Sequence, residues 1–446
     1  MADAPEGNAV IGQSGGPTSV INASLVGAVE QAKKHDNIGR MYGALNGIEG
    51  VLHERMVDLE TLDDEALGRL RYTPSAAIGS VRLKVTDRDL ERALDVFAEH
   101  NIRYFFYAGG NDSQKTSLMI SEAAAARDYD LVCIGIPKTI DNDLPETDHC
   151  PGYGSVARFV ASAECFANRD NAALRDIHVA ECMGRDSGWI TAARRLARQD
   201  ESDGPHMILL PEVPFVDEKF YEDVRHFYHK YGRCMIAASE GIRYYNEDGT
   251  PGQRVAQASA YTDAFGHEQL GGVAEHLGNM LEDKLGYKVR SDKHGVLNRC
   301  FMYCASAQDL EEAYEVGRKA VELAAEGETG QMVTIVRTGR DPYEWTTGLT
   351  EFENVAEKKR DVPKQWIAEN DIDVDEDFVE YLRPLVRGEE PDRLGYGPDL
   401  PHYPLPEMPR VERKLGDYVD SRGWWYDGKH GRFIRGKLDE NTEWSE

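Results

Sequence analysis

The sequence has little positive charge for its length. Its 446 residues include 51 Lys and Arg against 79 Asp and Glu, which gives a formal net charge of -28 at pH 7. Nucleic acids and anionic membranes are bound by basic surfaces, so this deficit argues against both as partners. It does not exclude a small anionic substrate, because a few local Arg and Lys residues are enough to build an anion pocket.

Paired cysteines and membrane-length apolar runs are also absent. The seven cysteines stand singly, without a CxxC pair, at positions 133, 150, 165, 182, 234, 300 and 304. Single cysteines within apolar runs are typical of buried, reduced thiols, so we expect a cytoplasmic protein. No stretch reaches the roughly 20 apolar residues of a membrane helix, and the polar first residues do not resemble a signal peptide. We therefore expect no association with a membrane.

What the sequence does contain is an alternation of short apolar runs with helix-like segments. This pattern predicts an α/β fold with doubly wound, mostly parallel sheets. A chain of 446 residues with 41% hydrophobic composition can form two domains and an elaborated C-terminus. The predicted strands are 9–12, 104–107, 131–136, 177–182, 207–210, 234–238 and 332–336. The predicted helices are 17–33, 87–100, 112–127, 187–198 and 310–326.

The most informative segment is 134–143, in which an apolar strand is followed by Lys138, Thr139, Asp141 and Asp143. Ligands of open α/β sheets bind at the carboxyl ends of parallel strands, so these side chains should line a site. A carboxylate there can accept a proton from a hydroxyl nucleophile while the lysine neutralises phosphate oxygens. Taken alone, the segment fits equally well an Asx turn that satisfies its own backbone groups.

Two glycine-containing loops favour phosphoryl transfer over the simple turn. Residues 13–18 and 108–113 each carry a Gly-Gly pair between a predicted strand and a predicted helix. This arrangement lets backbone amides and a helix N-terminus approach phosphate closely. One such loop would be an ordinary tight turn, but two of them beside the lysine-carboxylate loop indicate a phosphate site.

Taken in chain order, these loops resemble those of the phosphofructokinase family. The resemblance rests on 14–17, 109–113, 137–143 and Met-Gly-Arg at 183–185, and it covers about residues 8–340. The string Thr-Ile-Asp-Asn-Asp at 139–143 is its most specific part. The pyrophosphate-dependent branch is the most similar. It implies reversible phosphoryl transfer from pyrophosphate to the 1-hydroxyl of fructose 6-phosphate, in glycolysis and gluconeogenesis, with Mg²⁺ as cofactor.

The resemblance also implies roles for individual residues. Asp141 would be the base that takes the proton of the sugar hydroxyl, with Lys138, Thr139 and Asp112 completing the catalytic group. The donor would be bound by Gly15, Gly16, Arg82, Gly110, Asn111 and Ser113. The sugar phosphate would be bound by Asp143, Met183, Gly184, Arg185, Glu240, Arg299 and the weaker candidate Arg290. Any one arginine is more often a solvated surface charge, but together they match the family spacing.

Two side chains bear on the choice of phosphoryl donor. By resemblance, ATP-dependent members carry glycine at Asp112 and commonly also at Lys138. An aspartate at 112 would fill the space of the α-phosphate and repel its charge. A lysine at 138 can stabilise the departing phosphate. Both side chains favour pyrophosphate as the phosphoryl donor.

Three positions depart from the family pattern. Asn111 replaces the usual magnesium-binding aspartate, and a neutral amide is a poorer ligand for a hard cation. Asn111 and Asp112 are the candidate metal residues, but Mg²⁺ would then be held mainly by pyrophosphate oxygens, water and Asp112 or Asp141. Val296 stands where many relatives place a tyrosine against the sugar. Arg175 is a weak substitute for an arginine that many relatives lend to a neighbouring subunit.

These departures leave other functions open. One is an ATP-dependent 6-phosphofructokinase, and another is a noncatalytic, regulatory member that binds sugar phosphate. A kinase related to the lipid and NAD kinases would share the Gly-Gly loop, but would not explain 139–143 or 183–185.

We expect three regions in the chain. Residues 1–150 with a returning segment at about 260–305 would form the phosphoryl-donor domain. Residues 151–259 with about 306–345 would form the sugar-phosphate domain, and 346–446 a C-terminal extension packed on the core. Because the family builds its active sites across a subunit contact, a homo-oligomer is implied, with a dimer favoured over a tetramer.

Overall fold

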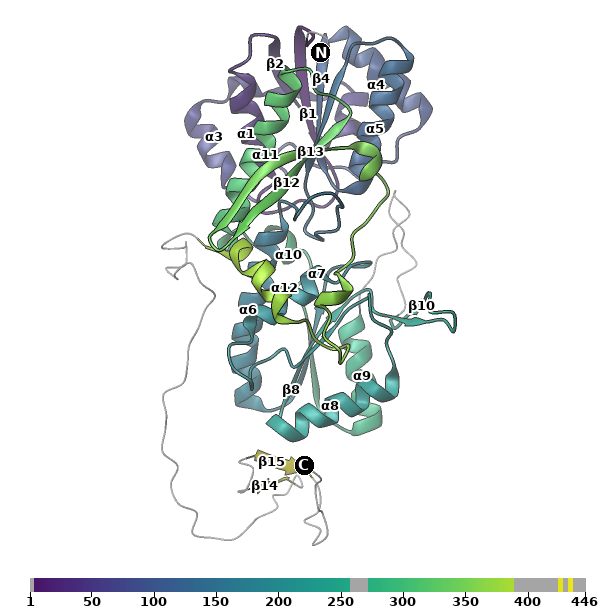
Figure 1. Ribbon diagram of the computed structural model, residues 1–446, viewed down its shortest axis with the longest axis vertical. Helices are drawn as coiled ribbons and strands as arrows, with labels where there is room; N and C mark the ends of the chain where they lie inside the picture. The colour runs from purple at the N-terminus through teal and green to yellow at the C-terminus, as the bar shows by residue number, and fades with distance from the viewer. Residues whose placement is uncertain (1–3, 257–271, 389–423, 428–431, 436–446) are drawn as a thin grey trace.

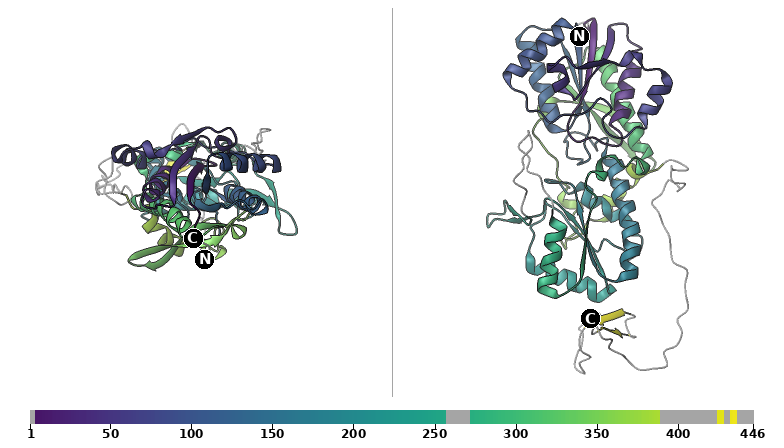
Figure 2. Two further views of the ribbon diagram at one scale, coloured as in Figure 1. Left: turned by 90° about the horizontal axis from the view of Figure 1, so that it is seen from above. Right: turned by 180° about the vertical axis from the view of Figure 1, so that it is seen from behind.

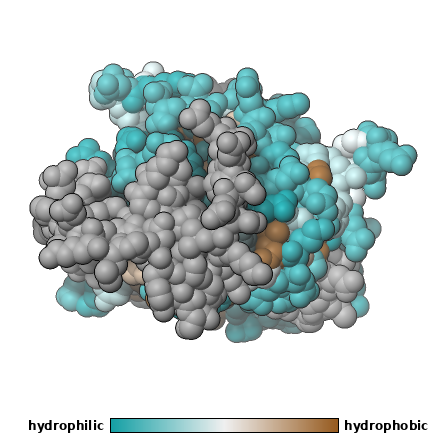
Figure 3. All heavy atoms as spheres, turned by 90° about the horizontal axis from the view of Figure 1, so that it is seen from below, coloured by the Kyte–Doolittle hydropathy of each residue, from teal (hydrophilic) through white to brown (hydrophobic). Residues whose placement is uncertain are grey.

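The computed structural model describes residues 4–256, 272–388, 424–427 and 432–435. These residues form two α/β domains stacked end to end, each with a sheet between layers of helices (Figure 1). Seen from below, the described surface is mainly hydrophilic, as the strongly charged composition leads one to expect (Figure 3). Within the described residues, no helix has the length and apolar composition needed to cross a membrane.

The first domain contains a seven-stranded sheet in the order β13-β12-β5-β4-β1-β2-β3. The strands from β12 to β2 run parallel, and β13 and β3 close the two edges in antiparallel orientation. Their bounds are β1 Gly7–Gln13, β2 Ile38–Ala44, β3 Met56–Asp58, β4 Ile102–Gly109, β5 Val132–Pro137, β12 Gln331–Arg340 and β13 Tyr343–Glu351.

Helices cover both faces of this sheet, as Figure 1 shows. The helices of one face are α1 Ile21–Ala32, α3 Asp64–Arg71 and α11 Ala307–Ala325; those of the other are α2 Ile48–Leu52, α4 Asp87–Glu99 and α5 Asn111–Ala126. Strand β1 illustrates how such a strand buries both of its faces. Ala9 and Ile11 are buried toward α1, and Val10 is buried toward α4. A strand between two helical layers needs apolar residues on both faces, hence the continuous apolar runs.

The second domain contains a parallel four-stranded sheet in the order β11-β6-β8-β7. Its strands are β6 Ile177–Cys182, β7 Met207–Leu209, β8 Cys234–Ser239 and β11 Val289–Lys293. The view from behind in Figure 2 shows helices on both sides of it. One face carries α6 Tyr153–Leu174, α7 Trp189–Ala193 and α12 Glu376–Leu382; the other carries α8 Asp217–Tyr231 and α9 Val273–Leu285. Smaller elements are α10 Leu297–Cys300 and the hairpins β9 Arg243–Tyr245 with β10 Pro251–Arg254 and β14 Trp424–Asp427 with β15 Arg432–Arg435.

The structure confirms the predicted fold class. All predicted strands and helices recur with shifts of a few residues at their ends, although only 189–193 of the predicted helix 187–198 is α-helical before a 3₁₀ turn. The long helix α6 was not predicted, because almost all of its first half is buried and it has no clear polar stripe. All seven cysteines are free and four are buried, as expected for reduced thiols.

The predicted assignment of the two returning segments to the domains is wrong. Strand β11 pairs with β6, so the described part of the 260–305 segment, residues 272–305, contributes to the second sheet and not the first. Helix α11 packs on α1 and β12 pairs with β5, so 306–345 returns to the first domain. Close packing of the two helices depends on Gly27 and Gly317, where a Cβ would lie about 2 Å from a backbone oxygen of the partner helix. Small residues at facing positions therefore select α1 as the partner of α11.

The region after β12 packs on both domains. Strand β13 completes the first sheet, and α12 contributes Phe378 and Leu382 to the core of the second domain. The described part of the predicted C-terminal extension therefore packs on the core. Beyond residue 388 only the β14-β15 hairpin is described, and the remainder lies outside the described residues.

Candidate functional site

A cleft of about 600 Å³ opens between the two domains. It is built on three adjacent strand ends of the first sheet, since Gln13 pairs with Ala108 and Gly109 pairs with Pro137. The loops that follow these strands therefore lie side by side. The described residues that line the cleft are Gly15, Gly16, Pro17, Arg82, Gly110, Asn111, Asp112, Ser113, Lys138, Thr139, Ile140, Asp141, Asp143, Met183, Gly184, Arg185, Asp186, Ser187, Glu240, Lys293, Gly295, Val296, Arg299 and Lys359. Every predicted site residue except Arg290 is among them.

Lys138 lies at the end of β5 and is 2% exposed. Its Nζ donates a hydrogen bond to the carbonyl oxygen of Gly16 at 2.7 Å. Burial, with a contribution from the nearby charge of Arg82, lowers the pKa of Lys138 to about 7. The ammonium is thus poorly solvated, and an anion in the cleft would stabilise its charged form.

Asp141 and Asp143 form a buried carboxylate pair in the cleft. The backbone N–H of Asp141 donates to Thr139 Oγ1 at 3.0 Å, and Thr139 Oγ1 donates to Asp143 Oδ1 at 3.4 Å. Burial raises the pKa of Asp141 against the opposing effect of Arg299 and Arg185. Burial and the charge of Asp141 raise the pKa of Asp143 to about 7. A carboxylate with a raised pKa is suited to act as a general base near neutral pH.

The residue between them has a structural task. Asn142 is fully buried in the left-handed region, with φ of 55°. Its Oδ1 accepts from the backbone N–H of Cys150 at 3.0 Å, and its Nδ2 donates to the Tyr381 hydroxyl at 3.1 Å. The Asx-turn interpretation of the segment therefore applies to Asn142, whereas the two aspartates line the cleft.

The N-terminus of α5 forms one end of the cleft. Gly110 precedes the helix and Asp112 lies in its first turn. The positive partial charge at the N-terminus of a 16-residue helix favours an anion at this position. Across the cleft, Gly15 has φ of +76°, a conformation that favours glycine. This end is suited to bind phosphate.

The opposite end of the cleft belongs to the second domain. The N–H of Gly184 donates to Glu240 Oε1 at 3.3 Å, and Ser239 Oγ donates to the carbonyl oxygen of Gly184 at 2.6 Å. Burial and the charge of Asp141 raise the pKa of Glu240. Burial, followed by the charge of Arg82, lowers the pKa of Arg299. Mutually repelling cations around a buried carboxylate are the electrostatic pattern of a site for a polyanion.

Arg290 does not line the cleft of its own chain. It lies on β11 at the edge of the second sheet, where its side chain is 45% exposed and its Nε donates to Asp176 Oδ2 at 2.6 Å. The prediction that Arg290 lines the pocket is therefore wrong within a single chain. Strand β11 forms the edge of the second sheet, and this position places Arg290 outside the cleft.

Several lining residues were not predicted. Lys293 ends β11 and pairs with the buried Glu181 at 2.6 Å, and Lys359 donates to the carbonyl oxygen of Asp186 at 3.4 Å. The sequence does contain a pattern that could have indicated Lys359, because residues 358–360 are three consecutive basic residues in an acidic chain. Val296 also lines the cleft, and its side chain is 65% exposed.

The donor set fits a metal held by substrate better than a protein-built metal cage. Within the described residues, no group of three or more His, Cys, Asp or Glu side chains is arranged so that it could hold a metal ion. Asn111 Oδ1 accepts from the N–H of Asp112 at 2.9 Å and its Nδ2 donates to the carbonyl oxygen of Lys358 at 3.3 Å. Mg²⁺ typically uses one or two carboxylates together with substrate phosphates. The carboxylates of Asp112 and Asp141 in the cleft meet that requirement.

A larger groove of about 1690 Å³ lies beside α12. Two of the arginines that line it are paired within the groove: Arg198 with Asp373 at 2.6 Å and Arg195 with Glu376 at 3.3 Å. The chemistry of phosphate binding therefore points to the smaller cleft.

Comparison with known proteins gives a consistent result. A match to the Phosphofructokinase family covers residues 8–324. The pyrophosphate--fructose 6-phosphate 1-phosphotransferase of Halomonas elongata is 42% identical over 92% of this chain and 99% of that protein. The enzyme of the same name from Rhodospirillum rubrum is 44% identical over 87% and 96%.

A solved structure shares the fold as well as the sequence. The crystal structure of a pyrophosphate-dependent phosphofructokinase from Marinobacter aquaeolei has a TM-score of 0.78 and 40% identity, over 92% of this chain and 100% of that chain. The chain therefore belongs to the phosphofructokinase family, and it is similar to the pyrophosphate-dependent members.

Proposed function

We propose that this protein is a cytoplasmic enzyme that reversibly transfers a phosphoryl group from pyrophosphate to the 1-hydroxyl of fructose 6-phosphate. The products are fructose 1,6-bisphosphate and phosphate. The observation that carries the proposal is the meeting of Lys138, Asp141 and Asp112 in one cleft between a helix N-terminus and an arginine-lined pocket. The relatives named above support pyrophosphate as donor, and the free cysteines support the location.

Each group has a task in the transfer. Asp141 takes the proton of the sugar 1-hydroxyl as its oxygen attacks phosphorus, and the bond to the departing phosphate breaks. Lys138 and Arg82 neutralise the charge that builds on that phosphate. Arg185, Glu240 and Arg299 orient the sugar phosphate, a task suited to the permanently charged guanidinium fork. The same residues serve the reverse reaction.

Mg²⁺ is the cofactor we propose. Asp112 would hold it together with pyrophosphate oxygens and water, and it would supply charge neutralisation on the transferring phosphate. Asn111 contributes less, since both of its side-chain polar atoms already bond to the protein.

One assay tests the proposal. Purified protein is incubated with fructose 6-phosphate and Mg²⁺, with pyrophosphate or ATP, and fructose 1,6-bisphosphate is followed. We expect product with pyrophosphate, none after chelation of Mg²⁺, and pyrophosphate from fructose 1,6-bisphosphate plus phosphate in reverse. Preference for ATP would identify an ATP-dependent phosphofructokinase. No product with either donor would favour the noncatalytic, regulatory member.

Asp112 should decide between the two donors. We expect Asp112→Gly to raise the ratio of kcat/KM for ATP to that for pyrophosphate at least about tenfold, which corresponds to roughly 1.4 kcal/mol. The glycine removes both the volume and the charge that would oppose an α-phosphate. Asp112→Asn is the matched control, because it removes only the charge. An unchanged ratio in Asp112→Gly would contradict the assigned role.

A second copy of the chain is the partner we propose. Exposed apolar side chains lie along α6 and beside α10, namely Phe166 at 45%, Leu174 at 50%, Leu297 at 47% and Tyr303 at 55%. Arg175 and Arg290 are also exposed at the end of this stripe. A symmetric contact here would cover the apolar surface and bring the two arginines beside another copy.

The contact is testable in solution. We expect the protein to sediment as a dimer, and Phe166→Asp with Leu174→Asp to give a monomer, because two charges would be buried in the contact. Val216→Asp is the control, since Val216 is 52% exposed next to α8, away from the stripe. A dimer that survives the double substitution would place the subunit contact elsewhere.

A further inference from the structure

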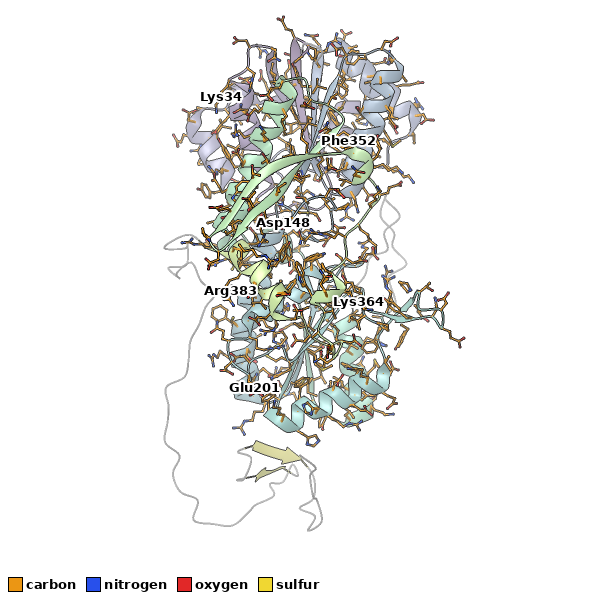
Figure 4. All side chains as sticks on the ribbon, viewed as in Figure 1. Lys34, Asp148, Glu201, Phe352, Lys364 and Arg383 are labelled. Atoms are coloured by element: carbon orange, nitrogen blue, oxygen red, sulfur yellow. The ribbon has the colours of Figure 1, made fainter. Side chains whose placement is uncertain are left out.

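Residues 357–362 form a strap along the cleft from the first domain to the second. At one end Glu357 pairs with Lys115 of α5. At the other end the N–H of Val362 donates to Glu212 Oε1 at 3.0 Å. Figure 4 labels residues beyond both ends, with Phe352 in the upper domain and Lys364 in the lower. The strap is thus anchored on both domains.

Arg360, in the middle of the strap, binds the backbone of the catalytic segment. Its Nη2 donates to the carbonyl oxygen of Asn142 at 3.0 Å, and its Nη1 donates to those of Thr147 at 2.7 Å and Asp148 at 2.8 Å. Its own N–H donates to the carbonyl oxygen of Asp143 at 2.7 Å. One residue therefore satisfies four carbonyl groups of residues 142–148.

The same residue contacts the sugar side of the cleft. The Arg360 guanidinium lies 4.7 Å from the ring centroid of Trp189, and its carbonyl oxygen accepts from Trp189 Nε1 at 3.0 Å. Trp189 begins α7, directly after the loop 183–188. Glu212, which holds Val362, also accepts from the N–H of Gly188 at 2.8 Å. The strap thereby links the catalytic segment to the loop that lines the other wall.

We propose that Arg360 is a positioning residue, whose guanidinium holds the carbonyl groups of Asn142, Thr147 and Asp148 so that Asp141 faces the sugar hydroxyl; this rests on the proposed function. Arg360 does not line the cleft and touches no reacting atom. A planar fork with five N–H donors can bind three carbonyl groups at once, which an ammonium cannot do with the same geometry. The backbone needs this support at Asn142, because that residue has a left-handed conformation that its surroundings must maintain.

The test compares two arginines of one buried network. We expect Arg360→Met to lower kcat by about 100-fold, the loss associated with a displacement of about 1 Å in a catalytic group. KM for both substrates should change less than about threefold, because Arg360 binds neither. Arg337→Met is the matched control. Arg337 donates to Asp148 Oδ1 and to the carbonyl oxygen of Tyr381, each at 3.0 Å, and neither group belongs to residues 141–143. The turnover of Arg337→Met should therefore stay near that of the native protein.

Two further measurements separate positioning from general destabilisation. Arg360→Lys keeps the charge but not the fork, and should recover less than about a tenth of the native kcat. Amide exchange of residues 141–144, which include Asn142 and exclude Asp148, should rise in Arg360→Met and not in Arg337→Met, a readout that does not depend on turnover. Native kcat in Arg360→Met, equal losses in both variants, or unchanged exchange would overturn the proposal. Absence of activity in the native protein would instead refute the proposed function, while the exchange data would still test Arg360.

Discussion

Asp141→Asn should lower kcat in both directions by about a thousandfold, within the range for removal of a general base. Asparagine keeps the shape of the side chain but cannot take the proton of the sugar hydroxyl. The buried position of Asp141, which raises its pKa, makes it basic enough for the task near neutral pH. Initial rates with saturating fructose 6-phosphate and pyrophosphate measure the loss.

The pH profile gives an independent check on Asp141. Below its raised pKa the carboxylate is protonated, so native kcat/KM should fall on the acid side at a pH above the ordinary range of an aspartate. The pKa of the neighbouring Asp143 is also raised, to about 7, so the acid limb of the profile reports the joint titration of Asp141 and Asp143. Asp141→Asn should lose the limb and still bind fructose 6-phosphate in a thermal-shift assay. Retained turnover would mean that another group is the base.

Lys138→Met should lower pyrophosphate-dependent turnover by about 10²- to 10³-fold, as removal of one preorganised electrostatic stabiliser typically does. The Nζ of Lys138 is held in the cleft beside Gly16, where the departing phosphate gains charge. Steady-state rates in both directions measure the effect. Lys138→Arg keeps the charge and is the control for charge alone. Turnover retained in Lys138→Met would contradict the role.

The same substitution should leave folding intact. The folded-state pKa of Lys138, about 7, lies below its ordinary value of 10.5, so the unfolded chain binds more protons between these pH values. Lys138 therefore destabilises the fold fully below about pH 7, and this cost disappears as pH rises toward 10.5. We expect the thermal midpoint of Lys138→Met to equal or exceed that of the native protein at pH 7, with the difference shrinking at higher pH.

Native activity should also fall on the alkaline side as Lys138 loses its proton in the free enzyme. This limb of kcat/KM for pyrophosphate begins near pH 7 and should be absent from the residual activity of Lys138→Met. Together with the acid limb from the Asp141–Asp143 pair, it predicts a narrow optimum close to neutral pH.

Most of the cleft could be predicted because its residues follow strand ends. Lys138 comes directly after β5 and Gly110 directly after β4, so an apolar run followed by polar loop chemistry already indicates their place. Asp112 also follows β4, and Gly15 follows the neighbouring strand β1. The rule fails for Arg290, because the local sequence of its strand does not indicate which of the two sheets the strand pairs with.

Local patterns in the chain determine the α/β class, the three loops that follow neighbouring strand ends, and Asp112 and Lys138, on which the proposed choice of donor rests. Such features depend on neighbours in sequence: strand periodicity, glycine pairs and a loop at a strand end. Tertiary structure decides which sheet each returning segment joins and brings Arg360 to Asn142 across 218 positions of the chain. Those contacts pair a side chain with distant backbone carbonyls or a helix with a glycine on another helix. Their free energy arises only once both segments are folded, so no local pattern encodes them.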